Sequence, residues 1–334
     1  MSKKNYSRRT FLGVTSAGIV ASKFRFAITN EVPMPRIAVI GVPTNSAGTT
    51  YGVARAPMAL RKAGLIESLK KISDVKDYGD VSFESPEPKR DPNSGLISPN
   101  STTSMIYAGK AAVSKARAEL RFPVVLGGDC PALLGGLACF RDARARTGLA
   151  FIDGHEDAYA PHESLTGEAA DMELGLALGL KTQGLPKKLS SLFPLVDRSE
   201  VIILGARDAE VIRKDGSSSI AGMVELHNDV EVQAGSSERI AASALSRLLT
   251  RVSAVWLHVD LDVLSTEALP AVDYPQPGGL SWEQLEPLTK AFLASTQVIG
   301  WDVTIYNPDL DRDGTFARRI VQFISNGISA RPLR

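Results

Sequence analysis

The sequence has few cysteines, almost no net charge and no long apolar run, and each absence excludes a class of protein. Two cysteines are too few for a disulfide framework. Lysine and arginine number 38 against 37 aspartates and glutamates, so the net charge of +1 provides no strong field for nucleic acid. No apolar run reaches the roughly 18 residues that a membrane-spanning helix needs. We therefore expect neither a nucleic-acid partner nor a membrane.

The composition that is present is that of a globular protein. Apolar residues make up 44% of the 334 residues and charged residues 22%, which excludes a mostly disordered chain and a collagen-like fibre. This length suits two average domains or one large α/β domain.

The N-terminal segment 1–27 differs in composition from the rest of the chain. It holds six basic residues and no acidic residue, and Ser7–Leu12 resembles the twin-arginine export signal. Without this segment the chain has 32 basic and 37 acidic residues, a net charge of −5. We expect a periplasmic or otherwise exported protein, cytoplasmic if the signal is not used, with 28–35 as a short linker. A frayed basic tail is the alternative.

The remaining chain alternates short apolar runs with segments of helical spacing. The expected strands are 36–42, 74–78, 122–126, 149–152, 201–204, 254–259 and 298–303. The expected helices are 56–71, 103–120, 133–146, 237–251 and 281–295. Continuous apolar strands separated by helices predict a mainly parallel sheet covered on both faces, a three-layer α/β/α fold, in one domain over 36–330.

Polar residues that can bind metal follow three of these strands. Asp153, His155 and Asp157 alternate after one strand, Asp260 and Asp262 alternate after another, and Gly127–Cys130 follows a third. Alternate residues of an extended segment point to the same side, so four carboxylates and an imidazole are expected to converge at one sheet edge. A cation cluster is the usual way to satisfy such a group, and its oxygen-rich donors favour Mn²⁺ or another hard divalent ion.

Several short motifs, in this order, resemble those of the arginase, agmatinase and formiminoglutamase family of ureohydrolases. They are Ile40–Pro43, Gly52–Arg61, Asp74–Asp80, Gly127–Asp129, Asp153–Asp157, Asp260–Asp262, Pro277–Leu280 and Asn307–Pro308. The resemblance covers most of the chain and implies an arginase-like fold. It also implies a small-molecule substrate and a homo-oligomer, a trimer or hexamer.

The resemblance further implies a two-metal hydrolase of non-peptide C–N bonds in linear amidines or related compounds. In the family, two Mn²⁺ ions share a hydroxide that attacks an amidine- or guanidine-like carbon. Carried over, Asp153 and Asp260 bridge both ions. His155 and Asp262 complete one site, and Cys130 and Asp157 complete the other. His155 and Asp157 are thereby the expected catalytic residues.

Three departures from the family pattern affect the expected chemistry. Cys130 replaces a metal-binding histidine, and its thiolate suits Zn²⁺ better than Mn²⁺, although a merely packed cysteine is equally compatible. Ala170 replaces a proton-shuttling histidine, for which His162, Glu156 or Glu163 are the candidate substitutes. Ile305 replaces the guanidinium-binding glutamate, and an isoleucine cannot form a charge-assisted pair.

Other residues are candidates for the substrate pocket. Asp302 and Glu168 are possible replacements for the missing carboxylate, and Glu210 is a candidate to meet a substrate amine. Asp273 and Tyr274 lie in a loop that replaces a family motif. His258 shares a strand face with Asp260 and is a candidate to support a metal ligand.

Two other functions are compatible with these residues. A zinc-dependent amide hydrolase resembling the deacetylases needs only Asp153, His155 and Asp262. A non-catalytic remnant of the family needs no turnover at all. The identity and number of the bound metal ions separate the three possibilities.

Overall fold

The computed structural model describes residues 34–142, 146–180 and 182–332. The expected export segment 1–27, and the expected linker up to residue 33, lie outside these ranges. Within the described ranges, no helix is both long and apolar enough to cross a membrane.

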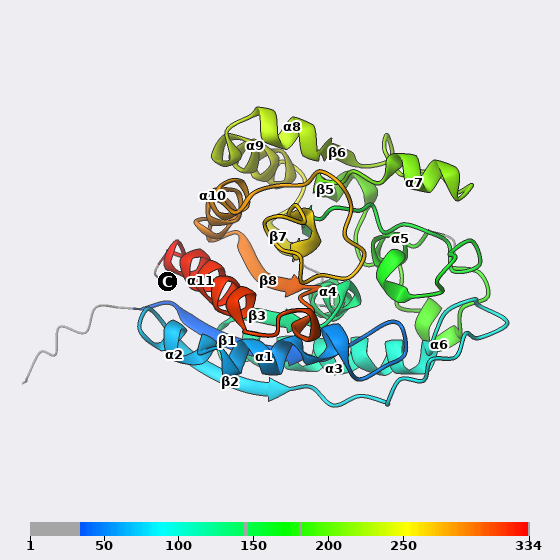
Figure 1. The fold of residues 1–334 in the computed structure, drawn as a ribbon, viewed down its shortest axis with the longest axis horizontal. Helices are drawn as coiled ribbons and strands as arrows, with labels where there is room; N and C mark the ends of the chain where they lie inside the picture. The colour runs from blue at the N-terminus through cyan, green and yellow to red at the C-terminus, as the bar shows by residue number, and fades with distance from the viewer. Residues whose placement is uncertain (1–33, 143–145, 181, 333–334) are drawn as a thin grey trace, which may run out of the picture. The chain divides into compact units, whose positions relative to one another are not determined.

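One eight-stranded sheet forms the centre of the described chain (Figure 1), and every pairing between its neighbouring strands is parallel. Its strands are β1 (Arg36–Val42), β2 (Asp74–Asp80), β3 (Phe122–Gly127), β4 (Thr147–Ile152), β5 (Val201–Gly205), β6 (Glu225–Asn228), β7 (Ala254–Asp260) and β8 (Val298–Thr304). Their order is β2-β1-β3-β8-β7-β4-β5-β6. The α/β fold class is confirmed, with a sheet more uniformly parallel than expected.

Helices cover both faces of this sheet. They are α1 (Ala56–Lys62), α2 (Leu65–Lys70), α3 (Pro99–Ala118), α4 (Leu133–Asp142), α5 (Glu173–Ala177), α6 (Lys187–Ser190), α7 (Ala209–Lys214), α8 (Asp229–Ala234), α9 (Ser237–Leu249), α10 (Trp282–Leu293) and α11 (Thr315–Ser329). Alternate strand residues enter two separate cores. Helices α1, α2, α9, α10 and α11 pack in one core, and α3, α4 and α5 pack in the other. This arrangement is the expected three-layer architecture.

The structure differs from the sequence-based expectation in several helical regions. The short helices α5, α6, α7 and α8 were not predicted. The expected helix 56–71 is two helices, because Gly64 lies between them in a left-handed conformation (φ 92°) that breaks the helical path. Helix α11 was not predicted, although Ile320, Phe323 and Ile324 have the spacing of a buried helical stripe. Strand β6 is short and half-buried, so it carries no apolar run for a sequence pattern to detect.

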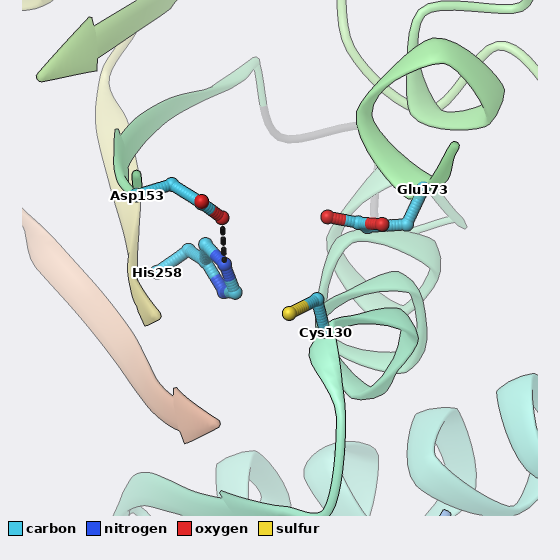
Figure 2. A group of neighbouring side chains, drawn as sticks. All are labelled: Cys130, Asp153, Glu173 and His258. Carbon is cyan, nitrogen blue, oxygen red and sulfur yellow. Dashed lines mark ion pairs between the residues drawn. The ribbon is translucent and has the colours of Figure 1, made fainter. Parts of the chain in front are cut away.

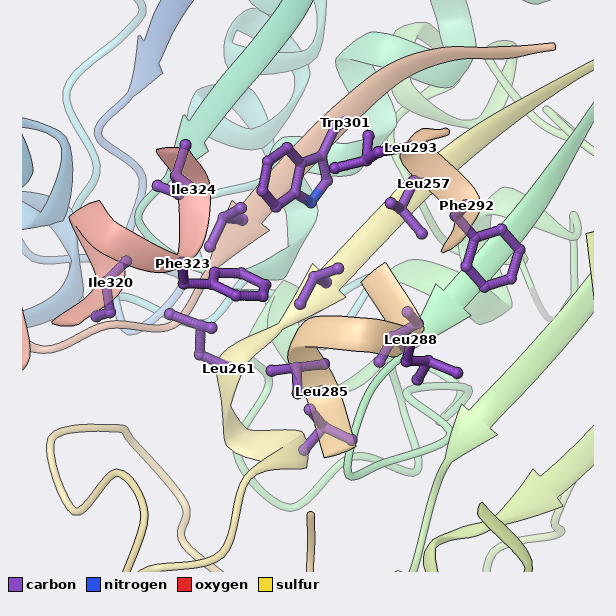
Figure 3. Packing of buried hydrophobic residues seen from close by; sticks show 14 of the residues in the cluster. Leu257, Leu261, Leu285, Leu288, Phe292, Leu293, Trp301, Ile320, Phe323 and Ile324 are labelled. Atoms are coloured by element: carbon purple, nitrogen blue, oxygen red, sulfur yellow. The ribbon is translucent and has the colours of Figure 1, made fainter. Parts of the chain in front are cut away.

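The core on the α10 and α11 side supports the two central strands. Leu285 and Leu288 of α10, Phe323 of α11, Leu257 of β7 and Trp301 of β8 pack together there (Figure 3). All five side chains are buried. This packing supports β7 and β8, and both strands end at the edge where the metal-binding residues lie.

Candidate metal centre

Three strands, β3, β4 and β7, bring the expected ligands to one edge of the sheet, and β8 lies between β3 and β7. Cys130 begins the turn after β3, Asp153 follows β4, and Asp260 is the last residue of β7. Because the strands of this sheet are parallel, their carboxyl ends meet at the same edge. Three groups of side chains there have potential metal-ligating atoms within 4.8 Å of one another, and we call them close groups. Together they include all six expected ligands, Cys130, Asp153, His155, Asp157, Asp260 and Asp262. Asp153 belongs to every one of these groups, so it stands at the centre of the site.

His155 and Asp262 form one half of the site. His155 Nδ1 lies 3.0 Å from Asp262 Oδ2 and 3.6 Å from Asp153 Oδ1. Burial alone lowers the pKa of His155, but the charge of Asp262 and the contact with Asp153 outweigh it and raise that pKa well above its usual value. The Gly154 backbone N–H donates to Asp262 Oδ1 at 3.1 Å and fixes this carboxylate.

Cys130 forms part of the other half. Its thiol donates a short hydrogen bond to Asp260 Oδ2, and its Sγ lies 3.7 Å from Thr304 Oγ1. Burial raises the pKa of Cys130 well above its usual value, and the negative charge of Asp260 adds to this effect. A thiolate at this position therefore requires a cation close by.

The donor set fits divalent metal ions. Burial raises the pKa of Asp157 and of Asp260 well above the usual value. A neighbouring carboxylate adds to each shift: Glu173 acts on Asp157, and Asp262 acts on Asp260. Among the described residues, histidines are the only side chains that form ion pairs with the carboxylates of this cluster. Buried carboxylates that lack a lysine or arginine partner need either protons or a metal ion. Oxygen, nitrogen and sulfur donors within 4.8 Å of one another suit a metal ion.

Sequence reasoning missed one buried acid at this site. Glu173 is the first residue of α5, is fully buried, and has no hydrogen-bond partner for either carboxylate oxygen among the described residues. It belongs to a close group with Cys130, Asp153 and His258. A signal was present, because Glu173 is the one charged residue in the otherwise apolar run Met172–Leu178.

A cavity of about 200 Å³ opens beside the metal-binding residues. Its wall includes His155, Asp157, Glu168, Asp208 and Ile305. Six carboxylates and no lysine or arginine line it within the described chain. Burial raises the pKa of Glu168 to about 7 and that of Asp208 to about 6. Such a wall favours a small cationic ligand.

The expected substrate-binding residues fall in different places. Glu168 lines the cavity and accepts a hydrogen bond from the Tyr274 hydroxyl at 2.9 Å. Glu210 lies outside the cavity wall, with its side chain 79% exposed and 3.6 Å from Lys214. Asp302 is fully buried behind His258, where it accepts hydrogen bonds from His258 and Trp256. Neither Glu210 nor Asp302 therefore lies on the cavity wall.

Asp273 lines a second, neighbouring cavity, where it accepts a hydrogen bond from Asn307 Nδ2 at 2.6 Å.

The candidate proton shuttles also lie away from the cavity wall. Glu156 is buried and accepts hydrogen bonds of 2.6 Å from Ser219 Oγ and the Ile220 backbone. His162 has a side chain that is 60% exposed. Glu163 accepts a hydrogen bond from Ser217 Oγ at 3.3 Å.

The residue in place of the family's glutamate, Ile305, has a strained backbone. Its φ of 69° lies in the left-handed region, which β-branched residues rarely adopt. The Ile305 backbone N–H donates to the Gly128 carbonyl at 2.7 Å and holds the residue there. Asp157 and Tyr274, also on the cavity wall, have φ values of 41° and 56°. Strained residues of this kind gather at functional sites.

A parallel sheet with acidic and histidine ligands at its carboxyl edge defines an α/β metallohydrolase. The comparisons with known proteins specify the family. The model of the arginase family matches residues 35–328, and the chain belongs to this family.

The similar proteins agree with this assignment. The arginase of Bacillus caldovelox is 29% identical over 286 residues, covering 83% of this chain and 93% of that protein. Human arginase-1 is 27% identical over 282 residues, covering 83% and 86%. The solved structure of the B. caldovelox enzyme superposes with a TM-score of 0.77 at 26% identity, over 90% of this chain and all of that one. Formimidoylglutamase from Bacillus subtilis, at 16% identity and a TM-score of 0.69, shares the fold.

The family and the site together define a metal-dependent hydrolase of the ureohydrolase type. Family members hydrolyse C–N bonds of guanidino and amidino compounds. The buried carboxylate and histidine ligands at the sheet edge agree with this chemistry. The family match favours it over the deacetylase-like alternative.

Proposed function

We propose that this protein hydrolyses a C–N bond in a small cationic amidine- or guanidine-type compound, using two divalent metal ions. The observation that carries the proposal is the ligand cluster beside a cavity whose wall, among the described residues, holds six carboxylates and no lysine or arginine. Asp153 would hold both ions, with His155, Asp260 and Asp262 on one side and Cys130 on the other. Two such ions supply Lewis acidity and lower the pKa of water.

Glu168 is the proposed substrate-recognition residue. Its carboxylate lies on the cavity wall, where Tyr274 orients it through a hydrogen bond of 2.9 Å. An ionised carboxylate accepts strong hydrogen bonds from an amidinium or guanidinium group. Ile305 offers apolar contact at the position where the family has its glutamate. The cavity volume of about 200 Å³ limits the substrate to a small molecule.

Mn²⁺ is the proposed ion on the His155 and Asp262 side of the site. Carboxylate and imidazole donors predominate there, and such donors suit hard divalent ions. His155 and Asp157, both on the cavity wall, are the proposed residues for positioning the substrate and handling its protons.

The test is a substrate screen with metal analysis. Purified protein, loaded with Mn²⁺, is incubated with a panel of small guanidines and amidines, and urea and ammonia are measured. We expect turnover that the Asp262→Asn variant loses, while Asp142→Asn, changed at a half-exposed position on α4, retains it. Hydrolysis of acetylated amines alone would replace this proposal with the deacetylase-like function. A metal-loaded protein that hydrolyses neither class would indicate a non-catalytic family member.

We also propose export through the twin-arginine route and assembly into a trimer or hexamer. The export proposal rests on Ser7–Leu12, and the assembly proposal rests on the family resemblance alone. Cell fractionation of wild type and of an Arg8→Lys/Arg9→Lys variant tests export. Equal distribution of the two proteins between compartments would contradict it. Sedimentation of the purified protein measures the assembly, and a monomer would contradict it.

A further inference from the structure

Four buried side chains meet beside the ligand set implied by the family resemblance. Figure 2 shows Cys130 after β3, Asp153 after β4, Glu173 at the start of α5 and His258 on β7 around a common centre. One donor atom from each of the four lies within 4.8 Å of the other three. Each side chain is at most 2% exposed. Sulfur, nitrogen and oxygen donors thus face the same small volume.

Several donor atoms in this cluster have no hydrogen-bond partner. Within the described chain, both carboxylate oxygens of Glu173 are buried without a hydrogen-bond partner. His258 Nε2 and Asp153 Oδ2 are also buried without a hydrogen bond, and they form an ion pair with each other at 3.5 Å. Buried polar atoms are almost always satisfied, because leaving one without a partner is energetically costly. Three buried side chains with donor atoms that lack hydrogen bonds, all bordering one centre, therefore favour the binding of a metal ion there. These missing hydrogen bonds are a separate observation from the presence of carboxylates in the cluster.

His258 is held in the orientation of a metal ligand. Its Nδ1 contacts Asp302 Oδ2, and its ring stacks on Phe151 with the ring centroids 4.6 Å apart. With the Nδ1 hydrogen donated to the Asp302 carboxylate, the lone pair of the neutral ring is on Nε2. That nitrogen lies 3.5 Å from Asp153 Oδ2, on the cluster side of the ring. A carboxylate behind a histidine, as here, is typical of histidines that bind zinc.

We propose that Cys130, Asp153, Glu173 and His258 form a mixed-donor metal site that selects Zn²⁺ or Co²⁺ over Mn²⁺. In this site, Glu173 and His258 take the places that the family resemblance gives to Asp157 and Asp260. The site deepens the proposed function, on which it rests, because it assigns this chain's own ligands to one of the two ions. A thiolate and an imidazole favour the softer metal.

Metal binding here is an exchange of protons for a cation. The thiol proton of Cys130 and any proton on His258 Nε2 leave to solvent as the metal binds. The competing arrangement is a protonated His258 paired with Asp153 and Asp302. It is supported by the charge of Asp302 and the contacts with both carboxylates, which outweigh burial and raise the pKa of His258 to about 10. The experiment must therefore detect bonding to sulfur and nitrogen directly.

Co²⁺ provides that readout without any measurement of turnover. Metal-free protein is titrated with Co²⁺, and its absorption spectrum is recorded. We expect a thiolate-to-Co²⁺ charge-transfer band in the near ultraviolet and intense visible bands of a four-coordinate ion. Cys130→Ser should lose the charge-transfer band. Cys139→Ser should retain it, because the other buried cysteine contacts Ser114 at 3.2 Å, outside the cluster.

The two ligands that the family resemblance does not assign are tested by Glu173→Gln and His258→Asn. We expect each variant to weaken Co²⁺ binding about 10- to 100-fold, as measured by the charge-transfer band. His155→Ala, changed in the other half of the site, should keep the band. Circular dichroism checks that each variant is folded, and the wild-type spectrum alone is decisive if a variant fails to fold.

Two results would overturn the inference. One is a Co²⁺-loaded wild-type protein without a thiolate band, and the other is wild-type Co²⁺ affinity in both folded variants. The outcomes also separate this inference from the proposed function. A thiolate band in a protein that hydrolyses no amidine rejects only the proposed function, and amidine hydrolysis without a thiolate band rejects only the mixed-donor site.

Discussion

Asp302 on β8 joins two buried rings of the neighbouring strand β7, because its Oδ2 contacts His258 Nδ1 and its Oδ1 accepts the Trp256 Nε1 hydrogen. The register of β7 against β8 places His258 directly opposite Asp302. All three side chains are fully buried. One carboxylate therefore fixes both the orientation and the tautomer of His258, and it does so from behind the cluster.

This relationship predicts the effect of Asp302→Asn. The amide keeps the shape and can still accept from Trp256, but it is a weaker partner for His258. We expect Co²⁺ and Zn²⁺ affinity to fall about 10- to 100-fold, measured by competition with a metal indicator. Asp142→Asn, at a half-exposed position on α4, is the control and should bind as wild type does. Unchanged affinity in Asp302→Asn would show that His258 does not act through this carboxylate.

Glu168 predicts a pH dependence of activity. Its pKa of about 7, raised by burial, means that the carboxyl is neutral at lower pH and ionised at higher pH. Because only the ionised form attracts a cationic substrate, we expect kcat/KM to rise as the pH passes through about 7. Glu168→Gln should lose this dependence and reduce kcat/KM about 10- to 100-fold, the value of one charge-assisted hydrogen bond. Glu210→Gln, on the exposed side of α7, is the control, and a Glu168→Gln profile like that of wild type would exclude Glu168 from recognition.

Ile305 predicts a gain of function. Ile305→Glu places a carboxylate on the cavity wall, and it also removes a β-branched residue from a left-handed backbone position. We expect kcat/KM for a guanidine substrate to rise at least about tenfold, equivalent to about 1.4 kcal/mol of transition-state stabilisation. Ile305→Leu relieves the same strain without adding charge. An equal gain in both variants would assign the effect to strain and not to the carboxylate.

Chelation should destabilise the fold. A metal ion that binds only the folded protein stabilises it by about 2.7 kcal/mol at a free concentration a hundredfold above the dissociation constant. We therefore expect urea unfolding at a lower midpoint when a chelator is added. Asp153→Asn removes the carboxylate common to every ligand group, so the chelator should have no effect on this variant. Identical wild-type midpoints with and without chelator would show that no structural gain accompanies metal binding.

The core behind the site should be sensitive to truncation. Leu288 of α10 is fully buried between β7 and the outer helices (Figure 3). Leu288→Ala should lower the free energy of unfolding by about 2–5 kcal/mol, because it leaves a cavity. Leu310→Ala, at a side chain 56% exposed, should change it by less than about 0.5 kcal/mol. Denaturant unfolding measures both values, and equal effects would contradict this assignment of the core.

Much of the site was predictable because its residues are local to strand ends. Asp153, His155 and Asp157 alternate directly after an apolar strand, and Asp260 and Asp262 repeat the pattern. Parallel strands bring their carboxyl ends to one edge, so these five residues were expected together. The structure places these five residues in two close groups that share Asp153, one with His155 and Asp157 and the other with Asp260 and Asp262.

The sequence by itself determined the alternation of strands and helices, because apolar runs and helical spacing are local properties of the chain. Tertiary structure alone decided which distant side chains share the site. The strand register places His258 against Asp302, 44 residues away. The packing of α5 buries Glu173 beside Cys130. Neither contact follows from spacing along the chain, because each depends on how separate elements meet in three dimensions.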